Sequence, residues 1–173
     1  ISYGNENPTL LWLFIAEIIK KTNFIVADCI VWKKKNAVPN TTSKNKLTRI
    51  YEFVLVIVRK DEFLTFNSNK KVVKTTTKGQ DFYEVFYNMI EANNNDGSNE
   101  LNKATFSSEL VRKLLRIYNK KDSLIYDSFM GTGTTAKACI IENMNFIGSE
   151  ISKNQVDFAN KRLSIYKNQK KLF

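Results

Sequence analysis

The last third of the sequence alternates between short β-type runs and helical runs, and this alternation is the strongest constraint on the fold. Leu124–Tyr126 and Phe146–Gly148 are typical of short strands, and Thr134–Asn143 and Ile151–Ile165, which follow them, are typical of helices. A strand, a helix and a second strand at this spacing predict two parallel strands joined by a crossover helix. We therefore expect an α/β fold with a mostly parallel sheet and flanking helices.

Two further helices are predicted upstream of this region. Leu10–Lys20 is apolar on most faces, which predicts a largely buried helix. Ser107 can cap a helix that runs to Tyr118 and carries its leucine and valine side chains on one face. In the last helix, Ser152 and Gln155 have the spacing of a capping box.

The middle of the chain contains two β-type runs and a polar stretch. Phe24–Trp32 and Tyr51–Arg59 are predicted strands, and the second is nearly continuous in apolar character, which favours a central position in a sheet. Residues 61–101 are polar and weakly periodic, apart from Asp81–Ile90, which we expect to form a short aromatic helix. A stretch of this length is either a surface loop or lid, or an insertion that binds a partner.

The segment Asp127–Thr135, with the sequence DSFMGTGTT, carries the clearest functional signal. Its two glycines allow a tight turn and a close approach of the backbone to a ligand. The two threonines that follow open a helix whose first N–H groups lack partners within the helix. The next strand ends at Glu150, 19 residues after Gly131, where a carboxylate can accept both hydroxyls of a ribose.

Several ligands are compatible with such a turn. A Walker-type phosphate site needs a lysine directly after the second glycine, where this sequence has Thr134, so that class is excluded. The pattern Gly131-x-Gly133-x-x-Ala136 formally matches the nicotinamide fingerprint. S-adenosylmethionine needs the same carboxylates and turn without a pyrophosphate. A turn that binds no ligand is the remaining alternative.

Composition narrows the function further. The 173 residues include no histidine, which excludes a histidine-based zinc site and a catalytic triad, and the two cysteines are too few for a disulfide framework. No apolar stretch approaches the roughly 20 residues of a spanning helix, and no leader sequence is recognisable, so we expect a cytoplasmic protein. The net charge of +10 favours nucleic acid first and acidic lipid second, with compositional drift an equal alternative.

Family resemblance distinguishes among the ligands. Asp127–Thr135 resembles the D-P-F-x-G-x-G-T-T motif of DNA amino-methyltransferases, which methylate adenine N6 or cytosine N4, although Ser128 replaces the usual proline. Other segments resemble the family in the same order along the chain, namely Ile30–Lys34 with Pro39, Arg49 and Glu52, then Lys103–Ser107 with Leu110, Leu114 and Leu115, then Phe146–Ile151, and finally Gln155 with Arg162 and Leu163. A nicotinamide-dependent oxidoreductase would leave the segment from Lys103 to Leu115 unexplained.

This resemblance implies a Rossmann-like S-adenosylmethionine-dependent methyltransferase fold of the permuted class, partial at its N-terminal end. It implies a single domain in which residues 1–60 are the remainder of the catalytic half, 61–101 a target-recognition insertion and 102–173 the cofactor-binding half. The cofactor would be S-adenosyl-L-methionine and the substrate double-stranded DNA of a bacterial restriction–modification system. The residues implied for the cofactor are Lys103, Thr105, Asp127, Phe129, Gly131, Gly133, Thr134, Thr135 and Glu150. Lys44, Lys46 and Arg49 are candidates for phosphate contacts, and a solvated loop is an equal alternative.

The family's catalytic tetrapeptide is absent. It consists of Asp, Asn or Ser, then two prolines and an aromatic residue, whereas Pro8 and Pro39 are the only prolines here. In the family this motif precedes a strand, and Ile1–Asn7 has the pattern of the end of that strand. We therefore expect the motif to lie on a missing N-terminal segment or a second chain, and a second copy of this chain is another partner that the resemblance allows. Without the motif, we expect cofactor binding but no methyl transfer by this chain alone, and the alternative is an inactive nucleic-acid-binding remnant of the fold.

Overall fold

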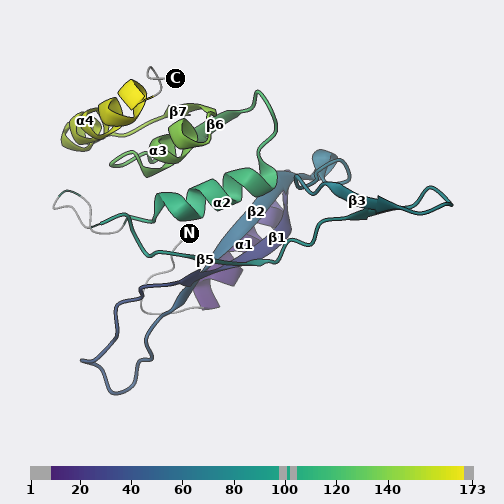
Figure 1. Cartoon of the computed structure of the whole chain (residues 1–173). Helices are drawn as coiled ribbons and strands as arrows, with labels where there is room; N and C mark the ends of the chain where they lie inside the picture. Colours follow the sequence, from purple (N-terminus) through teal and green to yellow (C-terminus); the bar gives the residue numbers. More distant parts are fainter. Residues whose placement is uncertain (1–8, 98–100, 102–104, 170–173) are drawn as a thin grey trace. The chain divides into compact units, whose positions relative to one another are not determined.

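The structure, a computed structural model, describes residues 9–97, 101 and 105–169 and forms two compact units (Figure 1). The first unit comprises the chain up to residue 68 together with 72–91, and the second comprises 69–71 and the chain from 92 onward. The expected strand end at Ile1–Asn7 and the candidate residue Lys103 lie outside the described residues. In the described part of the chain, no helix is both long and apolar enough to cross a bilayer.

Helix α1 (Thr9–Lys21) opens the first unit. The prediction that this helix is largely buried is wrong for the side chains described, because Leu13 and Phe14 are 58% and 70% exposed. Ile15 is buried, and the ring of Trp12 lies 5.4 Å from that of Phe53. A single helix against a single sheet is covered along one stripe only, so apolar residues on its other faces stay exposed.

The sheet of the first unit has the strand order β2-β1-β5, with β1 at Phe24–Lys34, β2 at Tyr51–Arg59 and β5 at Met89–Ala92. Both predicted strands are confirmed, and β1 and β2 pair antiparallel. The predicted central position of β2 is wrong, because β1 occupies the centre of the described sheet. A continuous apolar run indicates that both faces of a strand are covered. It does not indicate whether the strand has a neighbour along one edge or along both.

The polar stretch contains a short 3-10 helix, η1 (Lys60–Glu62), and an antiparallel ribbon of β3 (Val72–Thr75) and β4 (Asp81–Tyr83). The turn of the ribbon places Gly79 at a φ of 80°. The predicted aromatic helix at Asp81–Ile90 is therefore wrong, since this segment contributes to β4 and β5. Aromatic and β-branched residues favour extended backbone, and the glycine turn pairs them with β3.

The second unit follows the predicted alternation closely. Its elements are α2 (Ser108–Tyr118), β6 (Leu124–Asp127), α3 (Thr134–Ile141), β7 (Asn145–Gly148) and α4 (Lys153–Gln169). Strands β6 and β7 pair in parallel, as the crossover pattern predicts. The Ser107 cap is also confirmed, because its hydroxyl oxygen accepts a hydrogen bond from the Leu110 amide at 3.3 Å.

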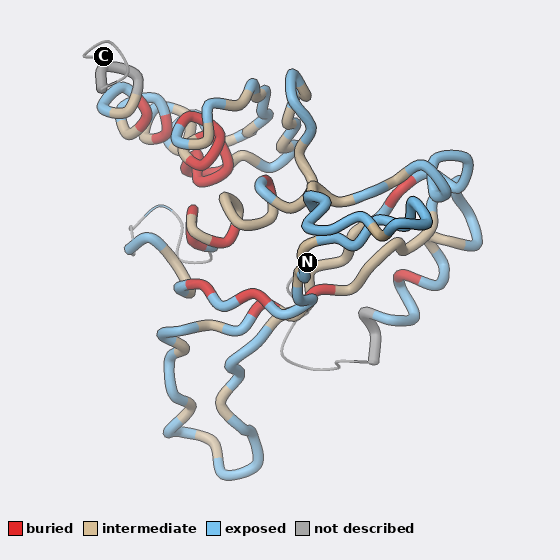
Figure 2. Tube along the Cα trace, turned by 45° about the vertical axis from the view of Figure 1, so that its right-hand side comes forward, coloured by how far each residue is buried: buried red, intermediate tan, exposed pale blue. Residues whose placement is uncertain are grey.

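Helix α3 forms the core of the second unit and packs against both α2 and α4. Its buried stretch is visible in Figure 2. Leu115 of α2 packs with Ala138 and Cys139, and Leu163 of α4 packs with the other side of α3. Across α2 and α3, Arg112 and Arg116 donate to the Glu142 carboxylate at 2.6 and 2.8 Å. Because α3 has neighbours on two sides, most of its residues are buried.

Asn69 closes the C-terminal end of α2. Its amide donates to the Ile117 carbonyl at 2.7 Å, and its side-chain Nδ2 donates to the carbonyls of Arg116 and Asn119 at 3.0 and 2.6 Å. The last carbonyls of a helix have no partners within it, so these bonds satisfy acceptors that would otherwise depend on water. Asn69 is therefore structurally part of the second unit, although the segments before residue 69 and after residue 71 belong to the first.

Candidate functional site

The turn between β6 and α3 depends on its two glycines. Gly131 and Gly133 have φ angles of 55° and 81°, in the left-handed region that favours glycine. The Gly133 amide donates to the Met130 carbonyl at 3.0 Å, and Gly133 is the N-cap of α3. The sequence DSFMGTGTT thus forms the predicted tight strand-to-helix turn.

Gly133 also allows helix α4 to come close to the turn. A Cβ on Gly133 would lie 3.1 Å from the Cβ of Ala159 and 3.6 Å from Cδ1 of Leu163, both on α4. The close neighbour of this glycine is therefore the last helix of the unit. The third role that glycine has in turns of this kind, close helix packing, applies at this position.

Glu150 bridges the ends of the two parallel strands. Its Oε2 accepts from the amide of Gly131 at 2.9 Å, and its Oε1 accepts from the amide of Ser152 at 2.8 Å. These backbone hydrogen bonds hold the pKa of Glu150 below its usual value, and the bond from Ser152 has the larger effect. The side chain is half-buried, so an ionised carboxylate lies fixed beside the glycine turn.

The same bond explains why the predicted capping box is wrong. A capping box would direct the Gln155 side chain to the Ser152 amide, but that amide is bonded to Glu150. The Gln155 Oε1 is buried and has no hydrogen-bond partner among the described residues. The Glu150 carboxylate, only two residues away, takes the Ser152 amide in place of the Gln155 side chain. The spacing of Ser152 and Gln155 does not reveal this local competition.

Asp127, at the end of β6, is the second carboxylate of the site. Its Oδ1 accepts from the Phe129 amide at 3.0 Å, and its Oδ2 accepts from the Thr135 hydroxyl at 2.6 Å. The Thr135 side chain is buried, as is that of Thr134. The two threonine side chains are therefore part of the buried side of the turn, and their hydroxyl groups do not face solvent.

The exposed part of the site combines carboxylates with apolar side chains. Phe129 is 88% exposed and Ile151 is fully exposed, and they flank the half-buried Asp127 and Glu150 along the chain. Met130 packs over Gly148, where a Cβ would collide with the methionine side chain. Solvent-facing apolar groups next to oriented carboxylates suit a ligand with one flat apolar part and several hydroxyl groups.

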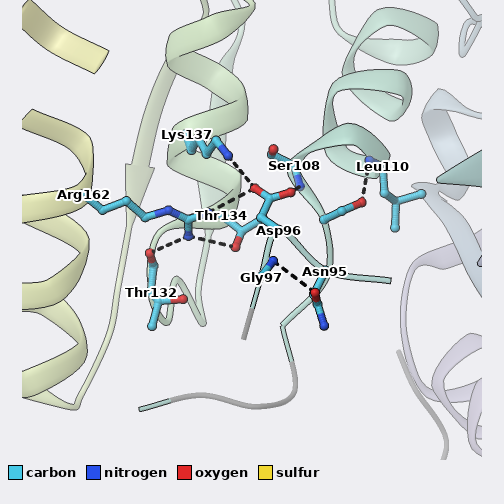
Figure 3. Close-up of polar contacts among 10 residues, drawn as sticks. Asn95, Asp96, Gly97, Ser108, Leu110, Thr132, Thr134, Lys137 and Arg162 are labelled. Carbon is cyan, nitrogen blue, oxygen red and sulfur yellow. Dashed lines mark hydrogen bonds and ion pairs between the residues drawn. The ribbon is translucent and has the colours of Figure 1, made fainter. Parts of the chain in front are cut away.

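The remaining predicted cofactor residue, Thr105, is half-buried and lies two residues before the Ser107 cap of α2. Sequence reasoning missed Arg162, which donates to the Thr132 carbonyl in the turn, and Asp96, which pairs with Arg162 (Figure 3). Arg162 matched the trailing helix of the family without a role, and nothing in the polar stretch distinguished Asp96 from its neighbours. Their separation of 66 residues left no local pattern to find.

The predicted DNA-binding residues lie on the loop between β1 and β2, in the first unit. Lys44, Lys46 and Arg49 are exposed there. Asn40 braces the loop from both of its nitrogens. Its Nδ2 donates to the Lys46 carbonyl at 2.7 Å, and its backbone amide donates to Oγ1 of Thr48 at 3.0 Å. The loop therefore presents its basic side chains on an internally bonded backbone.

A glycine turn after one strand and an acidic residue at the end of the next parallel strand define a Rossmann-like α/β protein with the layout of a nucleoside-binding site. Residues 1–161 match the model of the N6/N4 DNA methylase family, and the chain belongs to this family.

Relatives and solved structures agree with that family. The chain is 40% identical over 63 residues to the orphan methyltransferase M.BamHII of Bacillus amyloliquefaciens, a match that covers 36% of this chain and 24% of the relative. It is 25% identical over 165 residues to the type II methyltransferase M.Cfr9I of Citrobacter freundii, covering 86% of this chain and 48% of the relative. The chain thus spans about half the length of these relatives or less.

Two solved structures resemble the fold. The M1.HpyAVI–SAM complex has a TM-score of 0.63 and 27% identity, and the match covers 89% of this chain and 70% of that one. The cytosine-N4-specific PvuII DNA methyltransferase has a TM-score of 0.67 and 15% identity, covering 97% of this chain and 66% of that one. The second likeness supports the fold alone, and together they place the chain in the Rossmann-like methyltransferase fold.

Proposed function

We propose that this chain supplies the cofactor-binding and DNA-contacting parts of an S-adenosylmethionine-dependent DNA amino-methyltransferase of a type II restriction–modification system, acting in the cytoplasm. The observation that carries this proposal is the pairing of the Gly131 amide with the Glu150 carboxylate at the ends of two parallel strands. Membership of the N6/N4 DNA methylase family supports it, as does the likeness to M1.HpyAVI, whose structure contains SAM.

The hydrogen bonds of Glu150 leave room for a ribose. A carboxylate has about four acceptor positions, and in Glu150 Oε2 accepts from the Gly131 amide and Oε1 from the Ser152 amide. The carboxylate therefore keeps acceptor capacity for a ribose hydroxyl. Because the side chain is ionised and already oriented, it suits a neutral diol donor.

Other residues would complete the cofactor site. Phe129 supplies an exposed aromatic face, and Asp127 supplies acceptors toward the amino acid part of the cofactor. The buried segment from Gly131 to Thr135 forms the wall behind them, and Lys103 and Thr105 are assigned to the methionine side by resemblance. When bound, S-adenosylmethionine supplies a methyl group on a positively charged sulfur.

DNA contacts are assigned to the first unit. The loop that carries Lys44, Lys46 and Arg49 would contact phosphates. Residues 61–101 are proposed to recognise the target sequence, and their β3–β4 ribbon is exposed along both strands. A two-stranded ribbon fits the major groove of B-DNA, and an isolated ribbon is only marginally stable without a partner.

The direct test is calorimetric titration of the purified chain. We expect S-adenosylmethionine and S-adenosylhomocysteine to bind one per chain, and we expect no binding of NAD. Failure of both sulfur-containing ligands to bind at millimolar concentration would contradict the proposal. Binding of NAD instead would assign the glycine turn to a nicotinamide cofactor.

A further inference from the structure

Asp96 is the centre of an ion-pair cluster in the second unit (Figure 3). Its Oδ2 lies 2.7 Å from Nζ of Lys137 and 3.1 Å from an Nη atom of Arg162, and its Oδ1 accepts from the Ser108 amide at 2.8 Å. The side chains of Asp96, Lys137 and Arg162 are only 15%, 16% and 19% exposed. One carboxylate therefore joins α2, α3 and α4.

Arg162 extends this cluster to the glycine turn. Its Nη1 donates to the Thr132 carbonyl at 3.2 Å and lies 3.5 Å from the Thr134 hydroxyl. Thr132 is the residue between the two glycines, and it is 2% exposed. On the other side of the turn, the Gly131 amide is bonded to Glu150. The turn is thus held by two side chains, because Glu150 accepts from its Gly131 amide and Arg162 donates to its Thr132 carbonyl.

The charge of Asp96 is needed for this arrangement. Arg162 contacts the first turn of α3, where the positive end of the helix dipole disfavours a cation. Lys137 adds a second positive charge nearby, and removing one member of a nearly buried ion pair leaves an uncompensated charge. Burial alone would raise the pKa of Asp96, but the hydrogen bonds from Lys137 and Ser108 outweigh burial and lower it. Asp96 therefore remains ionised at neutral pH.

We propose that Asp96 and Arg162 are positioning residues for cofactor binding. Asp96 orients the guanidinium of Arg162, and Arg162 holds the Thr132 carbonyl so that the turn keeps its shape in the absence of ligand. One consequence of this inference rests on the proposed function, namely that S-adenosylmethionine binds more weakly when either residue is changed. Its structural part, the fixing of the turn, does not depend on the identity of the ligand.

Amide hydrogen exchange, resolved by residue with NMR, tests the structural part. We expect Asp96→Asn and Arg162→Met to accelerate exchange at the Gly131 and Gly133 amides by about tenfold or more, because a charge-assisted contact is lost. The Asn119 amide, which donates to the Leu115 carbonyl at the far end of α2, should keep its rate. Lys153→Met is the matched control, because Lys153 begins α4 with a side chain 85% exposed.

Arg162→Lys separates positioning from simple stability. Lysine can replace the charge opposite Asp96, but its single ammonium lacks the fork that reaches Asp96 and Thr132 together. We expect this variant to recover the melting temperature while exchange at Gly131 and Gly133 stays fast. Equal acceleration at Asn119, or no acceleration at the two glycines, would overturn the inference.

Titration with S-adenosylmethionine tests the consequence. We expect the dissociation constant to rise about tenfold in Asp96→Asn and Arg162→Lys and to be unchanged in Lys153→Met. Unchanged affinity in the first two variants would overturn the positioning role. If the unmodified chain binds no S-adenosylmethionine, the proposed function fails, and the exchange experiment still decides whether these residues fix the turn.

Discussion

The amide of Gly131 donates to the carboxylate of Glu150 over 2.9 Å, although the two residues are 19 positions apart. The bond joins the loop after β6 to the loop after β7, so the ends of the two parallel strands form one connected surface. An acidic side chain at this place is therefore both a candidate ligand contact and a support for the glycine turn.

Changing Glu150→Gln should weaken S-adenosylmethionine binding at least tenfold. The side-chain amide of glutamine keeps the size of the side chain but replaces one acceptor oxygen with an NH₂ donor. This donor would face either a backbone N–H, which is also a donor, or a ribose hydroxyl that needs an acceptor. Isothermal titration of the purified variant measures the effect. Asp157→Asn, which removes an exposed carboxylate on α4, is the control and should bind normally. Equal affinities for the two variants would remove Glu150 from the site.

The second unit should lose stability in acid through Glu142 and Asp96. For both groups burial raises the pKa, but hydrogen bonds from Arg116 and Arg112 to Glu142, and from Lys137 and Ser108 to Asp96, outweigh it and lower the pKa. A carboxyl group whose pKa is lower in the folded state stabilises the fold above its unfolded pKa of about 4, and this stability is lost as the pH falls through the folded pKa.

Urea denaturation between pH 7 and pH 3 measures this dependence. Glu142→Gln should cost about 1 kcal/mol at pH 7, since its partner Arg116 is largely exposed, and should flatten the loss of stability in acid. An acid dependence that is as steep in this variant as in the unmodified chain would assign the effect to other groups.

Gly133→Ala should destabilise the second unit by about 2–4 kcal/mol, because alanine disfavours the left-handed backbone and its methyl group would crowd Ala159. Gly79→Ala is a matched control, since Gly79 has a φ of 80° but open space around it. We expect this variant to lose only about 1 kcal/mol from backbone strain. Denaturation curves of both variants give the comparison, and equal losses would show that packing against α4 is unimportant.

The loop between β1 and β2 should contribute to DNA affinity through charge. Each phosphate contact adds about 0.9 to the slope of log affinity against log salt concentration, so Lys44→Ala with Lys46→Ala should lower the slope by about 2. Fluorescence anisotropy with a duplex oligonucleotide at several salt concentrations measures it. Lys20→Ala with Lys161→Ala removes the same charge from α1 and α4 and should leave the slope nearly unchanged. Indistinguishable slopes for the two double variants would make the loop a solvated surface.

Residues 1–173 alone should bind S-adenosylmethionine without transferring its methyl group to DNA. The sequence has no pair of adjacent prolines, and so lacks the tetrapeptide that would accept hydrogen bonds from the target amine and stack on a flipped base. Incorporation of radiolabelled methyl groups into duplex DNA measures transfer, with a full-length relative assayed in parallel. Labelled DNA above background from this chain would refute the expectation.

Local patterns predicted the second unit well, because each of its elements carries its own signal. Ser107 caps α2 in the structure as predicted, and the apolar periodicity marks β6, α3 and β7 with small shifts at their ends. The first unit was predicted less well. The exposure of Phe14 and the edge position of β2 depend on which surfaces meet across the chain, and a pattern of apolar residues does not encode that.

The candidate site shows the same division. The glycine turn and the position of Glu150 follow from spacing along one strand–helix–strand unit. Asp96 and Arg162 come from distant segments, and their pairing required the packed structure. The bond from Ser152 to Glu150 was also unpredictable, since two local motifs competed for one amide.

The position of Asn69 and Asp96 has a consequence for engineering. Both residues belong to the stretch 61–101 that we assign to target recognition, yet one closes the end of α2 and the other joins α2, α3 and α4. A cassette exchange that replaced the whole stretch to alter sequence specificity would remove both anchors at once. Grafts that begin after residue 71 and end before residue 92 would leave them in place, and these borders define the segment that can be swapped between relatives.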